Sequence, residues 1–192
     1  MAKLYFSYAS MNAGKSTLLL QASYNYRERG METLLLTAAI DRRSGEATIA
    51  SRIGVSSPAD TFATDDDLFN RIDTAHKAAP LHCVLLDEAQ FLTEDQVWQL
   101  ARVADDLSIP VMAYGLRTDF RGDLFPGSRA LLAIADELRE IRTICSCGRK
   151  ATMVVRLDET GQPILQGDQV DIGGNEKYVS YCRRHWREIM QR

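Results

Sequence analysis

The chain has 192 residues, a length that suits one full domain or one domain with a small appendage. Its 45% hydrophobic and 26% charged residues exclude an intrinsically disordered protein, and its net charge of −3 argues against binding nucleic acid through a broad basic surface. The N-terminus lacks a secretion signal and no apolar run approaches the ~20 residues that cross a membrane, so we expect a cytoplasmic protein with no membrane or nucleic-acid partner.

The first two thirds of the chain alternate between strand and helix patterns. Apolar runs of strand length occupy residues 4–9, 31–39, 81–90 and 109–116, and helical patterns occupy residues 15–30, 66–78 and 93–107. Gly30 is a helix stop signal and Thr93 a plausible N-cap. Residues 40–60 lack periodicity and predict a loop on the active side. The pattern predicts an α/β fold with a mainly parallel sheet covered by helices on both faces.

The pattern changes near Glu140, where short strands, turns and cysteines replace the long helices. We therefore predict an α/β domain over residues 1–142 and a small second module over residues 143–192. Ligands of such open sheets bind at the carboxyl ends of the strands.

The first strand leads into a phosphate-loop pattern that ends in Gly-Lys-Ser at the start of a helix. Such a loop wraps backbone N–H groups around a β-phosphate, while the lysine reaches the β- and γ-phosphate oxygens and the hydroxyl binds Mg²⁺. The alternative is a surface loop that caps an ordinary helix. The candidate residues are Ala9, Ser10, Met11, Asn12, Ala13, Gly14, Lys15 and Ser16, with Ala9 in place of the usual glycine.

A second element is the strand LHCVLLDEAQ, which delivers Asp87 and Glu88 to its carboxyl end. Asp87 is a candidate for holding Mg²⁺, and Glu88 for accepting a proton from an attacking nucleophile. The alternative is an acidic strand end that faces solvent. Arg43 and Arg121 are candidates for stabilising transition-state charge on a γ-phosphate, although each alone is more often a solvated surface residue.

Four candidate metal ligands occur in two pairs, C-x-C and C-x-x-H: Cys145, Cys147, Cys182 and His185. Two such pairs suit a closed, structural zinc site that stabilises a module too small for its own core. The alternative is that these cysteines are buried or reactive thiols. Cys83 lies in an apolar strand and we expect it to be inert, while His76 and His82 have no partner at ligand spacing.

Across almost its whole length the chain resembles the bacterial type II thymidine kinases. The resemblance rests on SMNAGKST, IDRRSG, LLDEAQF, YGLRTDFRG, CSCGRKA, IGGNEKYVS and CRRH, in the family's order and spacing. It implies a P-loop (RecA-like) sheet domain with a zinc-binding lasso module. It further implies ATP, Mg²⁺ and structural Zn²⁺ as cofactors, a homotetramer, and feedback inhibition by thymidine triphosphate.

The resemblance also implies roles for individual residues. ATP binds residues 9–16 and the run Asp87, Glu88, Ala89 and Gln90, and Glu88 accepts the proton of the sugar 5′-hydroxyl. A lasso over residues 166–178 closes over the nucleoside. The substrate residues implied are Phe120, Val170, Asp171, Ile172, Gly173 and Tyr178. Taken alone, each aromatic ring among them fits core packing equally well.

The leading hypothesis is transfer of the ATP γ-phosphate to the 5′-hydroxyl of thymidine or deoxyuridine. A P-loop ATPase motor or switch, with the zinc module on nucleic acid, is the alternative. ADP release that depends on thymidine, or instead on DNA or RNA, distinguishes the two. A non-enzymatic zinc-binding module is a third reading, which an assembled phosphate-transfer set disfavours.

Overall fold

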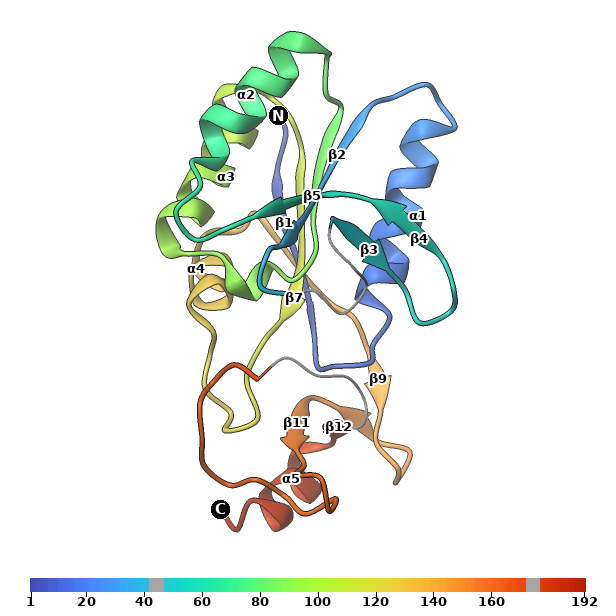
Figure 1. The fold of residues 1–192 in the computed structure, drawn as a ribbon, viewed down its shortest axis with the longest axis vertical. Coiled ribbons are helices and arrows are strands. Elements are labelled where there is room, and N and C mark those ends of the chain that lie inside the picture. Colours follow the sequence, from blue (N-terminus) through green and yellow to red (C-terminus); the bar gives the residue numbers. More distant parts are fainter. Residues whose placement is uncertain (42–46, 172–176) are drawn as a thin grey trace.

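A computed structural model describes residues 1–41, 47–171 and 177–192 and shows a central sheet beside a smaller C-terminal module (Figure 1). The sheet has six strands in the order β5-β2-β6-β7-β1-β8, and all neighbours are parallel. The strands are β1 (Leu4–Ala9), β2 (Thr33–Ala38), β5 (Asp60–Phe62), β6 (Cys83–Leu86), β7 (Val111–Leu116) and β8 (Glu137–Glu140). The predicted parallel α/β fold is confirmed.

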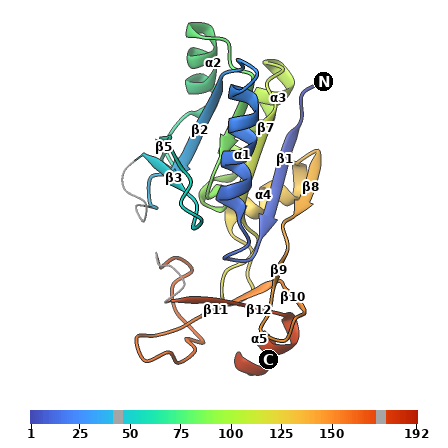
Figure 2. The same cartoon turned by 90° about the vertical axis from the view of Figure 1, so that its right-hand side faces the viewer.

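Four helices cover the two faces of the sheet: α1 (Lys15–Arg27), α2 (Leu68–Ala78), α3 (Glu94–Asp106) and α4 (Pro126–Ile134). Figure 2 shows α1 on one face and α2, α3 and α4 on the other. Thr93 caps α3 as predicted, because its hydroxyl accepts from the Gln96 backbone N–H and the Gln96 side chain accepts from the Thr93 backbone N–H. In the described residues, no helix has the length and apolar character needed to cross a membrane.

The core divides into two apolar layers on either side of the sheet. The larger contains Leu36, Leu86 and Val111 of the sheet with side chains of α2, α3 and α4, and the smaller places Leu19 and Leu20 of α1 against the opposite face. Because both faces are covered, all four residues of β6 are buried. This explains the uninterrupted apolar run before Asp87.

The prediction of a loop over residues 40–60 is wrong in detail. Strands β3 (Thr48–Ala50) and β4 (Ser56–Pro58) form an antiparallel hairpin, and β5 begins at Asp60 and extends the sheet beside β2. Strand β5 depends on a partner distant in sequence, and β3 and β4, at three residues each, are too short to show a local period.

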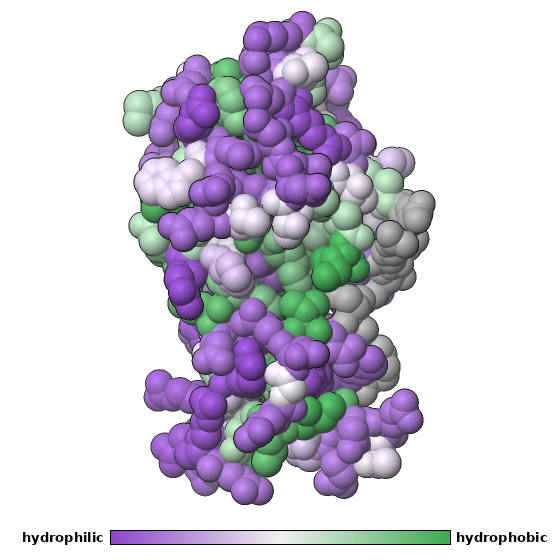
Figure 3. All heavy atoms as spheres, turned by 60° about the vertical axis from the view of Figure 1, so that its left-hand side comes forward, coloured by the Kyte–Doolittle hydropathy of each residue, from purple (hydrophilic) through white to green (hydrophobic). Residues whose placement is uncertain are grey.

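The C-terminal module lies beyond the carboxyl ends of the sheet strands (Figures 1 and 2). Its elements are β9 (Thr143–Ile144), β10 (Lys150–Ala151), β11 (Met153–Arg156), β12 (Tyr178–Tyr181) and α5 (Arg183–Ile189). A small apolar cluster joins Phe120 to Met153, Val155, Trp186 and Met190. On the face in Figure 3, hydrophobic residues gather where the module meets the sheet domain. The division of the chain into domains over residues 1–142 and 143–192 stays a prediction.

Candidate active site

The phosphate-loop candidate connects the end of β1 to the start of α1. Gly14 has φ 82°, a left-handed conformation that glycine adopts readily, and it forms the N-cap of α1. Lys15 is buried and its Nζ donates to the Ser10 carbonyl at 3.3 Å. Residues 11–17 line one wall of a cavity of about 480 Å³. The backbone thus turns a positively polarised helix end and a lysine toward enclosed space.

The carboxylate candidates lie against this loop. The Ser16 hydroxyl donates to Asp87 Oδ2 at 2.6 Å, which joins the two sequence motifs across 71 residues. The Glu88 backbone N–H donates to Asp87 Oδ1 at 3.0 Å. Burial and the neighbouring Glu88 carboxylate raise the pKa of Asp87 from 3.8 to about 6, against the lowering influence of Ser16 and Lys15. A bound cation would favour the ionised form.

Glu88 is turned away from the line of its strand. Its backbone has φ 55° and ψ 38°, a left-handed conformation uncommon for a residue with a side chain. Gln90 Nε2 donates to Glu88 Oε2 at 2.5 Å, and Gln90 Oε1 accepts from the Leu116 backbone N–H at 2.9 Å. Asp87 and Glu88 both line the cavity, although they are adjacent in sequence. The left-handed backbone of Glu88 gives its carboxylate a different direction from that of Asp87.

Close packing fixes the short 3₁₀ helix η1 (Ala89–Phe91) that follows Glu88. A Cβ at Gly127 of α4 would lie 2.6 Å from the Ala89 carbonyl oxygen and 2.7 Å from that of Leu92. Real Cβ atoms essentially never approach so closely, so α4 packs here only with glycine.

We expect Gly127→Ala to displace α4 from η1 and to disturb Glu88 through Gln90. Overpacking costs about 1–3 kcal/mol, so the melting temperature should fall by several degrees, and we expect kcat to fall roughly tenfold. Thermal melts and steady-state kinetics measure both. Arg129→Ala, at an exposed position of the same helix, is the matched control. Unchanged kcat in Gly127→Ala would show that η1 does not position Glu88.

The same cavity extends to the substrate candidates. Phe120, Val170, Asp171 and Tyr178 line it, and the Tyr178 hydroxyl donates to the Asp171 carbonyl at 2.6 Å. Ile172 and Gly173 lie outside the described residues. Sequence reasoning missed other lining residues, among them Leu116, Phe125, Val154 and the β3–β4 hairpin over residues 48–53.

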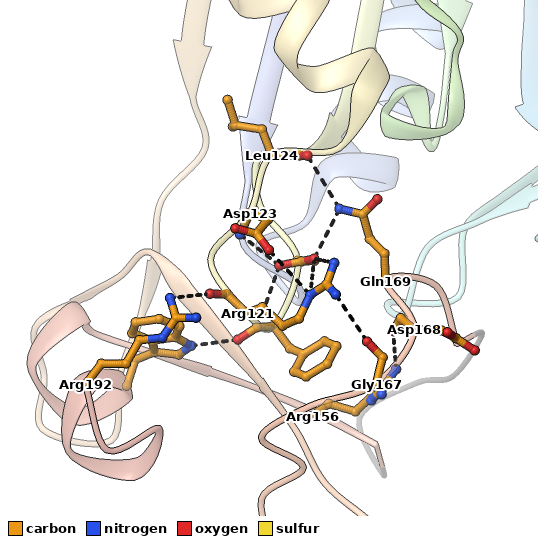
Figure 4. Close-up of polar contacts among 11 residues, drawn as sticks. Arg121, Asp123, Leu124, Arg156, Gly167, Asp168, Gln169 and Arg192 are labelled. Carbon is orange, nitrogen blue, oxygen red and sulfur yellow. Dashed lines mark hydrogen bonds and ion pairs between the residues drawn. The ribbon is translucent and has the colours of Figure 1, made fainter.

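Of the two arginine candidates, the structure describes one, and that one does not line the cavity. Arg43 lies outside the described residues. Arg121 donates to Asp119 Oδ2 at 3.1 and 3.2 Å and to the Gly167 carbonyl at 3.3 Å (Figure 4). Among the described residues that line the cavity, Arg121 is absent. Among the described residues, the cations that line the cavity are Lys15 and Arg52.

The four predicted metal ligands converge in the C-terminal module, and their ligand atoms all lie within 4.8 Å of one another. Cys145 Sγ lies 3.3 Å from His185 Nδ1, and Cys147 Sγ lies 3.8 Å from Cys182 Sγ. Burial raises the pKa of Cys145, but backbone N–H groups of Cys147 and Cys182, with His185, lower it to about 5. Three thiols and an imidazole at this separation fit tetrahedral zinc.

The histidines and cysteine outside this cluster have structural roles. His76 Nδ1 accepts from the Leu81 backbone N–H at 3.0 Å, and His82 Nδ1 accepts from that of Glu32 at 3.1 Å. Cys83 is fully buried, and burial raises the pKa of its thiol to about 12, which keeps it protonated and inert as predicted.

Comparison with known proteins shows the family of this chain. A family model described as thymidine kinase matches residues 2–186. The chain belongs to the thymidine kinase family. A thymidine kinase of Rhizobium meliloti (strain 1021) is 68% identical over 193 residues, which cover 100% of this chain and 99% of that protein. One of Escherichia coli O157:H7 is 59% identical over 100% of this chain and 93% of that protein.

Solved structures give a more distant match. A DNA replication initiation factor aligns with 73% of this thymidine kinase family member and 40% of its own chain, at a TM-score of 0.43 and 18% identity.

Proposed function

We propose that this thymidine kinase binds ATP and a thymine or uracil deoxynucleoside together in the cavity lined by the phosphate loop and Phe120. It then transfers the γ-phosphate to the sugar 5′-hydroxyl. The observation that carries the proposal is the Ser16–Asp87 hydrogen bond of 2.6 Å. It fixes the phosphate loop against the carboxylate pair in a cavity that Phe120 and Tyr178 also line. Both reactants therefore have walls suited to them within one enclosed space.

The phosphate end supplies positioning and charge. We propose that the backbone amides of the loop surround the β-phosphate and that Lys15 moves from the Ser10 carbonyl to the phosphate oxygens. The residues assigned to ATP are Ala9, Ser10, Met11, Asn12, Ala13, Gly14, Lys15, Ser16, Asp87, Glu88, Ala89 and Gln90. Ala9 is the last residue of β1, paired with Leu116, so it sets where the loop begins.

Ser16 and Asp87 are the residues that would hold Mg²⁺. A hydroxyl and a carboxylate are oxygen donors of the kind that this hard cation prefers, and their oxygens already lie 2.6 Å apart. When bound, the cation neutralises charge on the β- and γ-phosphate oxygens.

Glu88 is the residue to which we assign proton acceptance from the 5′-hydroxyl. Its left-handed backbone and its hydrogen bond from Gln90 aim the carboxylate differently from Asp87. One carboxylate is thus left for the cation and the other for the nucleophile.

The nucleoside end offers a planar base both aromatic and backbone contacts. Phe120, Val170, Asp171 and Tyr178 line the cavity, and we assign aromatic contacts to the two rings and backbone contacts to Val170 and Asp171. Hydrogen bonds from the backbone can read the edge of a pyrimidine base whatever the side chains.

Transfer of labelled γ-phosphate to a panel of nucleosides tests the proposal. We expect label on thymidine and deoxyuridine and little on purine nucleosides, with metal analysis of the same protein giving one zinc per chain. ADP release that needs DNA or RNA and ignores nucleosides would contradict the proposal. The homotetramer implied by the resemblance stays a prediction, which light scattering of the same sample measures.

The buried Asp87 predicts an unusual pH dependence of stability. Because its pKa is raised above 3.8, ionised Asp87 destabilises the ligand-free protein as the pH rises through about 6. Asp87→Asn should therefore stabilise the free protein at pH 8, by on the order of 2 kcal/mol, with no gain at pH 4. Asp105→Asn, at an exposed position, is the control. Equal melting temperatures of wild type and Asp87→Asn at pH 8 would contradict this.

A further inference from the structure

Strand β11 carries a buried arginine that the sequence analysis did not single out. Arg156 is 6% exposed and lies in a strand whose four residues are all buried. Within the part of the chain that the structure describes, no carboxylate pairs with Arg156 and its Nε has no hydrogen-bond partner. Burying a cation without an opposite charge is unfavourable. Contacts with neutral groups must therefore hold the Arg156 guanidinium in this buried position.

The first of these contacts is with the face of Phe120. The Arg156 Cζ lies 4.1 Å from the centre of the ring, a close cation–π contact shielded from solvent. The backbone at Phe120 is held as well, because Trp186 Nε1 donates to its carbonyl oxygen at 3.0 Å. The ring is thus fixed at its face and at its backbone, and it lines the cavity.

The second set of contacts is with residues 167–169. Arg156 Nη1 donates to the Asp168 carbonyl at 2.9 Å. Gly167 packs so closely that a Cβ there would lie 2.4 Å from Arg156 Nη2, and Arg121 Nη1 donates to the Gly167 carbonyl at 3.3 Å (Figure 4). The chain then continues to Val170 in the cavity wall.

Two further bonds close this network on the loop after β7. Gln169 Nε2 donates to Asp119 Oδ2 at 3.1 Å, and Asp119 Oδ2 also accepts from Arg121 Nη2 at 3.1 Å (Figure 4). Residues 119–121 and 167–169, far apart in sequence, are therefore held as one unit. Arg156 contacts Phe120 on one side of this unit and Asp168 on the other. It is absent from the described residues that line the cavity.

We propose that Arg156 is a positioning residue for the nucleoside, one that fixes the Phe120 ring and residues 167–169 in a single arrangement and so sets the wall against which the base lies. The proposal rests on the proposed function, because it requires a base beside Phe120. The Phe120 ring is 1% exposed and lines the cavity, so the orientation that Arg156 gives it sets part of the wall that a flat ligand meets.

Substitution of Arg156 separates this role from a general structural one. Arg156→Met should raise the KM for thymidine roughly tenfold or more, whereas the KM for ATP and kcat should stay within about twofold. Arg156→Lys should recover only part of the thymidine affinity, because an ammonium lacks the planar fork. An unchanged thymidine KM, or equal rises for thymidine and ATP, would overturn the proposal.

A pair of glycines tests the same idea with Arg156 in place. Gly167→Ala should push the guanidinium off the ring and raise the thymidine KM, whereas Gly161→Ala should leave it unchanged, since a Cβ there meets nothing within 4 Å. Both glycines have positive φ, 146° and 79°, so both variants carry backbone strain, which is larger for Gly167→Ala. If Arg156→Met does not fold, the two glycine variants test the proposal instead. Equal thymidine KM values for Gly167→Ala and Gly161→Ala would then reject it.

The wild-type chain, assayed in parallel, keeps the two proposals apart. Absence of thymidine-dependent transfer in the wild type would reject the proposed function itself. An active wild type with unaffected Arg156 and Gly167 variants would reject only the positioning role.

Discussion

Glu88→Gln should reduce phosphate transfer to thymidine by about 10²–10⁴-fold, the range that a general base contributes. Glutamine retains the size of the side chain and can accept the hydrogen bond that Gln90 donates, but it cannot take the proton of the 5′-hydroxyl. The loss should therefore appear in kcat. ATP should still raise the melting temperature of the variant as it does for the wild type.

Glu94→Gln is the matched control, because Glu94 is an exposed glutamate at the start of α3. It should leave both kcat and ATP binding unchanged. Turnover of Glu88→Gln within a few-fold of wild type would remove Glu88 from the role of base. Loss of the ATP-induced stabilisation would instead show that the substitution damages the nucleotide end.

Removal of zinc should unfold the C-terminal module and abolish thymidine phosphorylation. Structural zinc contributes about 10–16 kcal/mol of apparent binding free energy in small zinc-finger peptides, more than a module with so small a core can replace. Cys182 begins α5, and Trp186 of that helix donates to the Phe120 carbonyl at 3.0 Å. Loss of the metal therefore reaches the nucleoside wall. It also reaches the phosphate loop, because Ser10 donates to the Ala151 carbonyl at 3.3 Å and the Met11 carbonyl accepts from Ser180 at 2.6 Å.

Chelation and Cys182→Ser should each give this result, measured as hydrogen exchange of residues 143–171 and 177–192 beside kinetics. Ser146→Ala lies between two ligands and should leave zinc content and activity unchanged. Stabilisation by ATP should weaken in the metal-free protein without disappearing, because the loop loses its contacts with Ala151 and Ser180 but keeps those with the sheet domain. A zinc-free chain with full activity and unchanged exchange would show that the four-residue cluster is dispensable.

The parts of the fold that sequence predicts are those fixed by local patterns. The β1–loop–α1 unit follows from an apolar run that ends in Gly-Lys-Ser, and β6 from four buried residues before Asp87. The metal cluster follows from ligand chemistry and spacing, because few other arrangements explain two such pairs. In the first two cases the deciding signal lies within about ten residues of chain, whereas the metal cluster combines two local pairs that are distant in sequence.

The parts that sequence misses depend on distant partners. Strand β5 exists because it pairs with Leu36–Ala38 of β2, and the β3–β4 hairpin closes over the cavity without an alternating pattern. Helix α4 and strand β8 were likewise not predicted. A charged residue at the end of the apolar run Met153–Val155 was the available signal for Arg156, but its contact with Phe120 spans 36 residues.

The two walls of the cavity are anchored unequally. The phosphate loop joins a sheet domain with extensive apolar layers on both faces and has two further hydrogen bonds to the module, from Ser10 to Ala151 and from Ser180 to Met11. The wall at Phe120 depends on a cluster of five buried residues in the described chain. Regions with fewer buried contacts open at lower free energy. ATP should thus meet a preformed surface, while a nucleoside must order its own binding wall and lose conformational entropy in doing so. Calorimetric titration should accordingly show a more unfavourable entropy for the nucleoside than for the nucleotide.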